Sequence, residues 1–183
     1  MKGKEGLEWL RTIGIALVLA VFFRTFFFSG YIVDGESMMP TLENGNLLMI
    51  NKVVDEIEDL ERFDVIVFHA TSKDDFVKRI IGLPGDKVEY KNDILYINNE
   101  EVEEPYLHKY KVEHKDGGLT GDFTLNSISN GEAEVVPENH IFVLGDNRID
   151  SYDSRYFGFV PVENVVGKVN LRYWPIDEIG TDF

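Results

Sequence analysis

The chain contains no cysteine, and its 183 residues include only 18 lysines and arginines against 33 aspartates and glutamates. The absence of cysteine excludes disulfides, cysteine-ligated zinc sites and a cysteine nucleophile. The net charge of −15 argues against nucleic acid as a partner, because binding to phosphates requires a basic surface. The four histidines do not show metal-ligand spacing, so we expect no metal ion and no other cofactor.

One long hydrophobic run lies near the N-terminus, in a chain that is 44% hydrophobic overall. The run IGIALVLAVFF covers residues 13–23. Extended to residues 9–28, the segment has 20 residues, or about 30 Å of helix, which matches the apolar core of a bilayer. Arg11 and Arg24 lie close enough to its ends to reach the interface. We therefore predict a transmembrane anchor over residues 9–28.

The charge distribution predicts the orientation of this anchor. Residues 1–24 carry a net charge of +2, and the remaining 159 residues carry −17. Basic residues before a span favour a cytoplasmic N-terminus. We expect residues 1–8 to be a cytoplasmic tail, and residues 29–183 to form a domain on the extracytoplasmic side of the cell membrane.

Two alternatives to an anchor are a cleaved signal peptide and a buried core helix. A signal peptide also has a basic start and an apolar stretch, but the segment FFRTFFFSG lacks the small-residue spacing of a cleavage site. A buried core helix would have amphipathic neighbours, which are not found here.

The pattern after residue 31 predicts a mainly β domain. Short apolar runs such as LLMI at 47–50 and DVIVF at 64–68 are bounded by turn signals, and no helical periodicity of ten or more residues follows the anchor. Residues 98–139 are more polar, and we expect them to form a variable insertion between core strands. The acidic cluster at 100–104 is interpreted as a solvated face.

The stretch GESMMPTL, residues 35–42, contains a serine that has two interpretations. Ser37 is either an ordinary turn residue, since Gly35 and Pro40 interrupt regular structure, or a nucleophile in an apolar setting. A serine hydroxyl reacts only when a base takes its proton.

Lys78 is the candidate for that base. In the strand-like segment FVKRIIGLPGD, alternation puts Lys78 between Phe76 and Ile80 on one face. Burial among such neighbours lowers the pKa of a lysine and allows it to act as a general base. The alternative is a lysine on an edge strand that extends into water.

The segment GDNRIDSYDSRYFGFV, residues 145–160, is a third polar cluster. Arg79 cannot lose its charge, so a buried Arg79 requires a carboxylate, and this segment offers Asp146, Asp150 and Asp153. The segment is interpreted either as part of a site or as a salt-bridged turn framework.

Together these segments resemble the type I signal peptidases, in particular their Gram-positive branch. SMMPTL (37–42) is similar to the nucleophile box of that family, KRIIGLPGD (78–86) to the box of the general base, and residues 145–160 to a third box. RFDVIVF (62–68) is similar to a further strand, and the similarity covers almost the whole chain, anchor included. The resemblance implies an antiparallel β-sheet catalytic domain, with one N-terminal transmembrane helix.

The resemblance also implies roles for individual residues. Ser37 would be the nucleophile, Lys78 the general base, and Ser151 the residue whose hydroxyl orients the lysine. Met38 would line the pocket for the small residue before the cut. Five residues would support the site: Arg79, which we expect to pair with Asp146, together with Asp146 itself, Arg148, Asp153 and Arg155. Gly35 stands where some members have a serine that serves the oxyanion hole, so the second oxyanion donor is open.

The implied function is that of a membrane-bound serine endopeptidase that removes signal peptides from exported preproteins. Its partners would be those signal peptides, the lipid bilayer and the secretion machinery. The alternatives are a self-cleaving Ser–Lys protease of the SOS-repressor type, and a membrane-anchored scaffold that keeps the fold without the activity.

Overall fold

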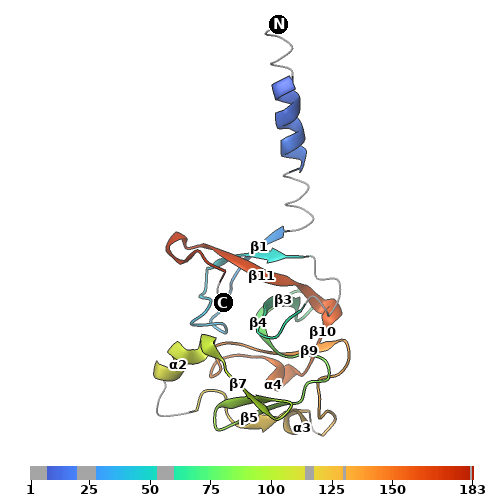
Figure 1. Cartoon of the computed structure of the whole chain (residues 1–183), viewed down its shortest axis with the longest axis vertical. Coiled ribbons are helices and arrows are strands. Elements are labelled where there is room, and N and C mark those ends of the chain that lie inside the picture. The colour runs from blue at the N-terminus through green and yellow to red at the C-terminus, as the bar shows by residue number, and fades with distance from the viewer. Residues whose placement is uncertain (1–7, 20–27, 53–59, 114–117, 130, 182) are drawn as a thin grey trace.

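The computed structural model describes residues 8–19, 28–52, 60–113, 118–129, 131–181 and 183. After an N-terminal helix these residues form two β-sheets, in which every strand pair is antiparallel. The larger sheet has seven strands in the order β1-β2-β11-β3-β4-β9-β10, and the smaller has four in the order β7-β6-β5-β8. The prediction of a mainly β, antiparallel fold is therefore confirmed (Figure 1).

The strands are short and mostly end at the turns that the sequence indicates. Asn92 and Asp93 between β5 and β6, and Asn98 and Asn99 between β6 and β7, have positive φ, as in the two-residue turns that match the twist of a hairpin. The larger sheet contains β1 (Phe28–Ile32), β2 (Leu47–Asn51), β3 (Val65–His69), β4 (Asp75–Gly82), β9 (His140–Leu144), β10 (Val160–Pro161) and β11 (Val165–Trp174). The smaller sheet contains β5 (Val88–Lys91), β6 (Ile94–Ile97), β7 (Glu100–Val102) and β8 (Phe123–Thr124). The helices after the first are η2 (Pro105–Leu107), α2 (His108–Glu113), α3 (Leu125–Ile128), α4 (Ser154–Phe157), η3 (Val162–Asn164) and η4 (Ile176–Glu178).

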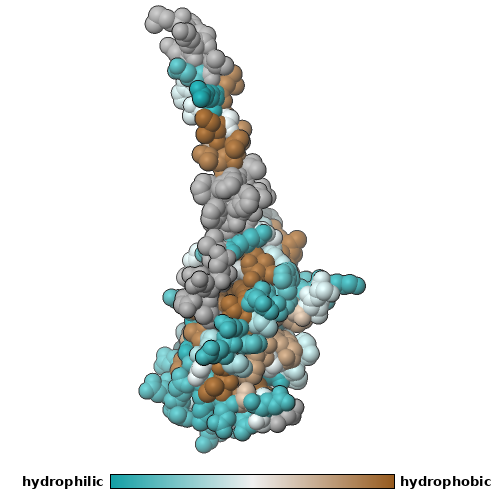
Figure 2. Space-filling view, turned by 90° about the vertical axis from the view of Figure 1, so that its right-hand side faces the viewer, coloured by the Kyte–Doolittle hydropathy of each residue, from teal (hydrophilic) through white to brown (hydrophobic). Residues whose placement is uncertain are grey.

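The N-terminal helix covers residues 8–19 and stands clear of both sheets (Figure 1). Its apolar side chains are exposed, and Figure 2 shows apolar surface along it. Within the described residues, no helix combines the length and the apolarity that crossing a bilayer requires. Residues 20–27 of the predicted anchor and residues 1–7 of the predicted tail lie outside the described residues. Phe28, the predicted last residue of the anchor, is the first residue of β1.

Strand β4 crosses the core and positions the site. Its first three residues are half-buried and residues 78–82 are fully buried. β4 pairs with β3 from Asp75 to Arg79, whereas β9 pairs with β4 only from Arg79 onward. In the described part of the chain, the β9-side edge of residues 75–78 therefore has no strand partner.

The polar segment 98–139 contributes β7 and β8 to the smaller sheet, whose other strands, β5 and β6, precede it. The interpretation of its acidic cluster as a solvated face is wrong for Glu104, which is only 4% exposed. Arg148 Nη2 donates to Glu104 Oε1 at 2.6 Å. The cause is Arg148 itself, which is 1% exposed and always charged, so that its burial requires a carboxylate.

Arg148 links the two sheets through a buried polar network. Its Nη1 donates to the Tyr90 hydroxyl on β5 at 2.7 Å, and its Nε donates to the Gly145 carbonyl oxygen, which follows β9, at 3.0 Å. The Tyr90 hydroxyl in turn donates to Glu104 at 2.5 Å. Burial raises the pKa of Tyr90 well above its ordinary value, so this hydroxyl remains a donor at any working pH.

We expect Glu104→Gln to lower the free energy of unfolding by about 3–5 kcal/mol, because it leaves the Arg148 guanidinium buried without a charged partner. Glu103→Gln is the control, since Glu103 is exposed one residue away, and it should change stability by less than about 0.5 kcal/mol. Urea unfolding of the two variants beside the parent measures both values. Equal stability of the two variants would contradict the assigned importance of the pair.

Candidate functional site

Ser37 lies in the turn that joins β1 to β2, and buried neighbours hold this turn against the core. Met38 is 1% exposed and Leu42 is fully buried, and both pack in one apolar cluster with residues of β2 and β3. The Leu42 N–H donates to the Met38 carbonyl oxygen at 2.9 Å and closes the turn. The apolar residues after Ser37 thus fix the direction in which its hydroxyl points.

The hydroxyl of Ser37 meets the amine of Lys78, which comes from β4. Lys78 Nζ donates to Ser37 Oγ at 2.6 Å and to the Val77 carbonyl oxygen at 3.1 Å. The ring of Phe76, on the same face of β4, has its centroid 5.2 Å from this nitrogen. The alternative in which Lys78 extends into water is wrong, since Lys78 is 3% exposed.

The environment of Lys78 favours its neutral form. Burial lowers the pKa of the Lys78 amine from its ordinary 10.5 to about 8, against the opposing effect of the carboxylates of Asp153 and Asp146. A substantial fraction of the amine is therefore unprotonated slightly above neutral pH. The sequence-based prediction of a buried lysine with a lowered pKa is confirmed.

Arg79, the next residue, points to the other face of β4 and pairs with Asp146. Its Nε donates to Asp146 Oδ1 at 2.9 Å and its Nη2 donates to Asp146 Oδ2 at 2.6 Å. Both side chains are at most 1% exposed, and the Thr41 hydroxyl also donates to Asp146, at 2.6 Å. The predicted ion pair between Arg79 and Asp146 is confirmed. The hydrogen bond from Thr41 connects this ion pair to the turn that contains Ser37.

Gly145 is held by two further charged residues of the third box, Asp153 and Arg148. Its N–H donates to Asp153 Oδ2 at 3.1 Å, and its carbonyl oxygen accepts from Arg148. Asp153 is itself paired with Arg155, whose Nε and Nη2 donate to it at 2.8 and 2.9 Å. All five residues predicted to support the site therefore take part in ion pairs around it.

Ser151 lies in the site but does not make the hydrogen bond that the resemblance implies. Its hydroxyl is buried and has no hydrogen-bond partner among the described residues. The hydroxyl lies close to Gly145, as does the Ser37 carbonyl oxygen, and both would collide with a Cβ at that glycine. The Lys78 amine uses its hydrogen bonds on Ser37 and Val77 instead.

Asn147 also contacts the turn that contains Ser37, and sequence reasoning did not identify this residue. Its backbone N–H donates to the Ser37 carbonyl oxygen at 3.0 Å, and its Nδ2 donates to the Glu36 carbonyl oxygen at 3.2 Å. The Gly35 N–H is occupied, because it donates to Asn44 Oδ1 at 3.0 Å. Among the described residues the Ser37 N–H makes no hydrogen bond, so it is available to an oxyanion.

This arrangement can support acyl transfer. A serine hydroxyl in contact with a buried, partly neutral amine is the nucleophile and base pair of the Ser–Lys class of serine hydrolases. In the part of the chain that the structure describes, no three histidine, aspartate or glutamate side chains are placed to hold a metal ion.

Comparison with known proteins gives the family. The profile of the family described as "Signal peptidase, peptidase S26" matches residues 6–174. A signal peptidase I of Bacillus caldolyticus is 53% identical over 182 residues, which cover 100% of this chain and 98% of that protein. A signal peptidase IB of Staphylococcus aureus is 45% identical over 183 residues, which cover 98% of this chain and 95% of that protein.

A crystal structure of a signal peptidase I from Enterococcus faecalis is also similar, with a TM-score of 0.56 and 46% identity, covering 60% of this chain and 95% of that one. The chain therefore belongs to the signal peptidase family, peptidase S26. The resemblance inferred from the sequence is confirmed.

We expect Gly145→Ala to reduce cleavage of a signal-peptide substrate at least about 100-fold, because the new methyl group would displace the Ser37 backbone and Ser151. Gly180→Ala is the matched control, since a Cβ there would meet no atom closer than 3.9 Å. The measurement is kcat/KM, with thermal unfolding to verify that both variants are folded. A fully active Gly145→Ala enzyme would show that the position of Ser37 does not depend on this contact.

Proposed function

We propose that this chain is a membrane-bound serine endopeptidase that removes signal peptides from exported preproteins. The observation that carries the proposal is the 2.6 Å contact between Ser37 Oγ and the buried Lys78 amine. Family membership supports the substrate class, and the geometry supports the assignment of Ser37 as nucleophile and Lys78 as general base.

The reaction proceeds through an acyl-enzyme. Neutral Lys78 takes the proton of Ser37, whose oxygen bonds to the scissile carbonyl carbon, and the developing oxyanion accepts from the Ser37 N–H. Protonated Lys78 then gives this proton to the leaving amine as the carbon–nitrogen bond breaks. Water, deprotonated by the Lys78 amine, then bonds to the acyl carbon of the ester. The bond between this carbon and Ser37 Oγ breaks, and Lys78 returns the proton to Ser37 Oγ. No cofactor enters this scheme.

The open edge of β4 is suited to hold the substrate. An extended peptide can pair by strand addition along the open edge, where Asp75 and Val77 direct their backbone groups away from β3. The Val77 carbonyl oxygen already accepts from Lys78 Nζ, so a peptide at this edge lies next to the Lys78 amine and brings its carbonyl groups to Ser37. Val77 packs against the apolar cluster that contains Met38. We propose that this surface accepts the small residue before the cut.

The residues around the pair act as positioning groups. Arg79 and Asp146 fix the strand and the nucleophile turn relative to each other, while Arg148, Asp153 and Arg155 hold Gly145. We propose that Ser151 orients Lys78 during the reaction, since its buried hydroxyl is unpartnered and lies against the same glycine as the Ser37 carbonyl oxygen.

We propose that the segment before β1, residues 9–27, anchors the chain in the cell membrane, with the N-terminus in the cytoplasm and the catalytic domain outside; the predicted end of the anchor at Phe28 is one residue too far, because Phe28 belongs to β1. The hydrophobic sequence and the exposed apolar side chains of residues 9–19 support an anchor. Ile32 and Trp174 both pair with Leu47, on opposite sides of β2, and are 66% and 49% exposed. This apolar row adjoins the strand that follows the anchor, so it is suited to contact lipid. Delivery of preproteins there implies association with the secretion machinery.

We expect Ser37→Ala and Lys78→Ala each to lower kcat/KM for a preprotein at least about 1,000-fold, because either change removes one member of the reacting pair. Lys73→Ala is the control, because Lys73 is an exposed lysine before the same strand, and it should cleave at the parental rate. A folded Lys78→Ala variant with normal turnover would exclude the proposed base.

The pH–rate profile should show one acid limb. The protonated amine cannot act as a base, so kcat/KM should rise with pH and level off above about pH 8, the pKa of Lys78. Asp153→Asn removes a charge that raises this pKa, so it should move the limb to lower pH. Asp150→Asn, at an exposed position nearby, should leave the limb in place. A flat profile between pH 6 and 9 would contradict the role of Lys78, on the expectation of about tenfold per pH unit below the pKa.

A further inference from the structure

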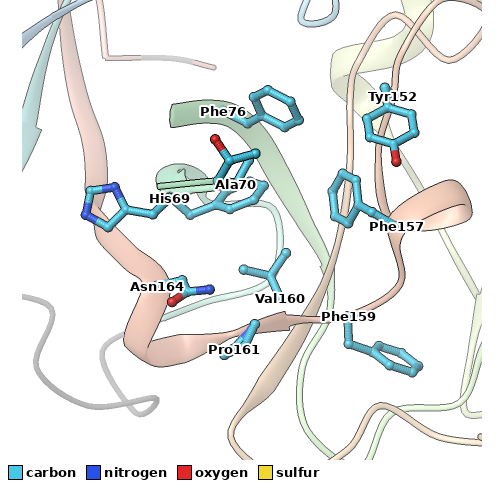
Figure 3. Close-up of a pocket in the computed structure, with 11 residues that line it drawn as sticks. His69, Ala70, Phe76, Tyr152, Phe157, Phe159, Val160, Pro161 and Asn164 are labelled. Carbon is cyan, nitrogen blue, oxygen red and sulfur yellow. The ribbon is translucent and has the colours of Figure 1, made fainter. Parts of the chain in front are cut away.

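An aromatic cavity lies beside the reactive pair and has no part in the chemistry described so far. Its volume is about 250 Å³. It lies between the end of the β3–β4 hairpin and the segment from Tyr152 to Asn164. Figure 3 shows the rings of Phe76, Tyr152 and Phe157 gathered at this hollow, with Val160 nearby.

Phe76 links the cavity to the surroundings of the Lys78 amine, although Lys78 itself does not line the cavity. Phe76 lines it, and the ring centroid of Phe76 is 5.2 Å from Lys78 Nζ. Tyr152, on another wall, directly follows Ser151 in the third box. Tyr152 is 60% exposed, so this wall is accessible to a substrate from solvent. Its ring centroid is 5.5 Å from that of Phe157, and this packing supports the wall.

The chemistry of the dyad determines which part of a substrate reaches this cavity. Lys78 must give its proton to the leaving amine, so the residue that begins with this amine passes next to Lys78. Phe76 shares the face of β4 that carries Lys78, whereas Val77, on the opposite face, packs with the cluster of Met38. The residue before the cut and the residue after it therefore lie toward opposite faces of the strand.

The size and lining of the cavity indicate what it would hold. A dry apolar cavity of about 150 Å³ is enough to bind benzene. At about 250 Å³ this cavity has room for a leucine or phenylalanine side chain. Its aromatic walls would favour such a side chain over a small or an acidic one, while His69, Thr71 and Asn164 contribute polar groups to the rest of the lining.

We propose that this cavity is a specificity site for the mature part of the substrate, and that it takes a large apolar side chain from the first residue after the cleaved bond. This inference rests on the proposed function. In this proposal Phe76, Tyr152 and Phe157 select the side chain that follows the cleaved bond, and the Met38 surface does not take part in that selection.

The test uses the full chain in detergent and a set of signal-peptide substrates that differ only after the cut. Alanine, leucine, phenylalanine or aspartate is placed at the first or the second position of the mature part. At the first position we expect the parent enzyme to cleave the leucine and phenylalanine peptides with kcat/KM at least about tenfold above the alanine peptide, and at the second position, whose side chain points to the other face, we expect no such preference. Tyr152→Ala should reduce this ratio to about twofold or less, and Tyr152→Phe should keep it, since the ring remains.

Ile149→Ala is the matched control, because Ile149 is a 58% exposed apolar residue of the same loop that does not line the cavity. It should keep both the parental ratio and the parental rate. Efficient cleavage with equal kcat/KM for all peptides would overturn the specificity site and leave the proposed function intact. A preference that survives Tyr152→Ala, or is lost in Ile149→Ala, would place the recognition elsewhere. If the preference is absent and Tyr152→Ala instead weakens binding to phosphatidylglycerol vesicles, the cavity is a lipid site. Failure of the parent to cleave any peptide would overturn both proposals.

Discussion

The contact between Ser37 and Lys78 can be reactive only if the Lys78 amine is sufficiently shielded from water to lose its proton. Two nearby carboxylates oppose this, because they favour the charged form of the amine. Burial lowers the pKa of Lys78, while Asp153 and Asp146 raise it. Each of these carboxylates is paired with an arginine, Asp146 with Arg79 and Asp153 with Arg155. A guanidinium group beside each carboxylate weakens the negative potential that the carboxylate exerts at the amine, because opposite charges at hydrogen-bond distance partly cancel farther away. The surrounding ion pairs are thus part of what keeps the base usable near neutral pH.

The same segment controls the position of Ser37, the proposed nucleophile. Gly145 follows β9 and receives the Asp153 carboxylate on its N–H and Arg148 on its carbonyl oxygen. Two residues on, the Asn147 N–H donates to the Ser37 carbonyl oxygen. Ser37 lies on a turn and Lys78 on a strand, 41 residues apart in the sequence. The loop that begins at Gly145 nevertheless influences both of them. A displacement of this loop would therefore alter the reacting distance and the electrostatics together.

The sequence was informative where a local pattern has a physical consequence. Alternation along one strand identifies Lys78 as a cation between large apolar neighbours, and it shows that Arg79 needs a carboxylate on the other face. Glu104 could not be recognised in the same way, because its partner Arg148 is 44 residues distant and only the folding of the second sheet brings them together. The hydroxyl of Ser151 and the aromatic cavity depend likewise on long-range packing, for which hydrophobic periodicity contains no signal.

The incomplete pairing of β4 explains why the site lies where it does. A strand edge with free backbone groups invites association with any extended chain, and proteins limit this with short edges and charged residues. Here the open edge is four residues long, with Asp75 at one end and Lys78 at the other. Such a short edge, with an ionisable residue at each end, can pair with a brief extended segment of a peptide. Successive side chains of that segment would point to opposite faces, one toward the proposed Met38 surface and the next toward the proposed Phe76 site. On these proposals, the geometry of a single strand would account for selection both before and after the cut.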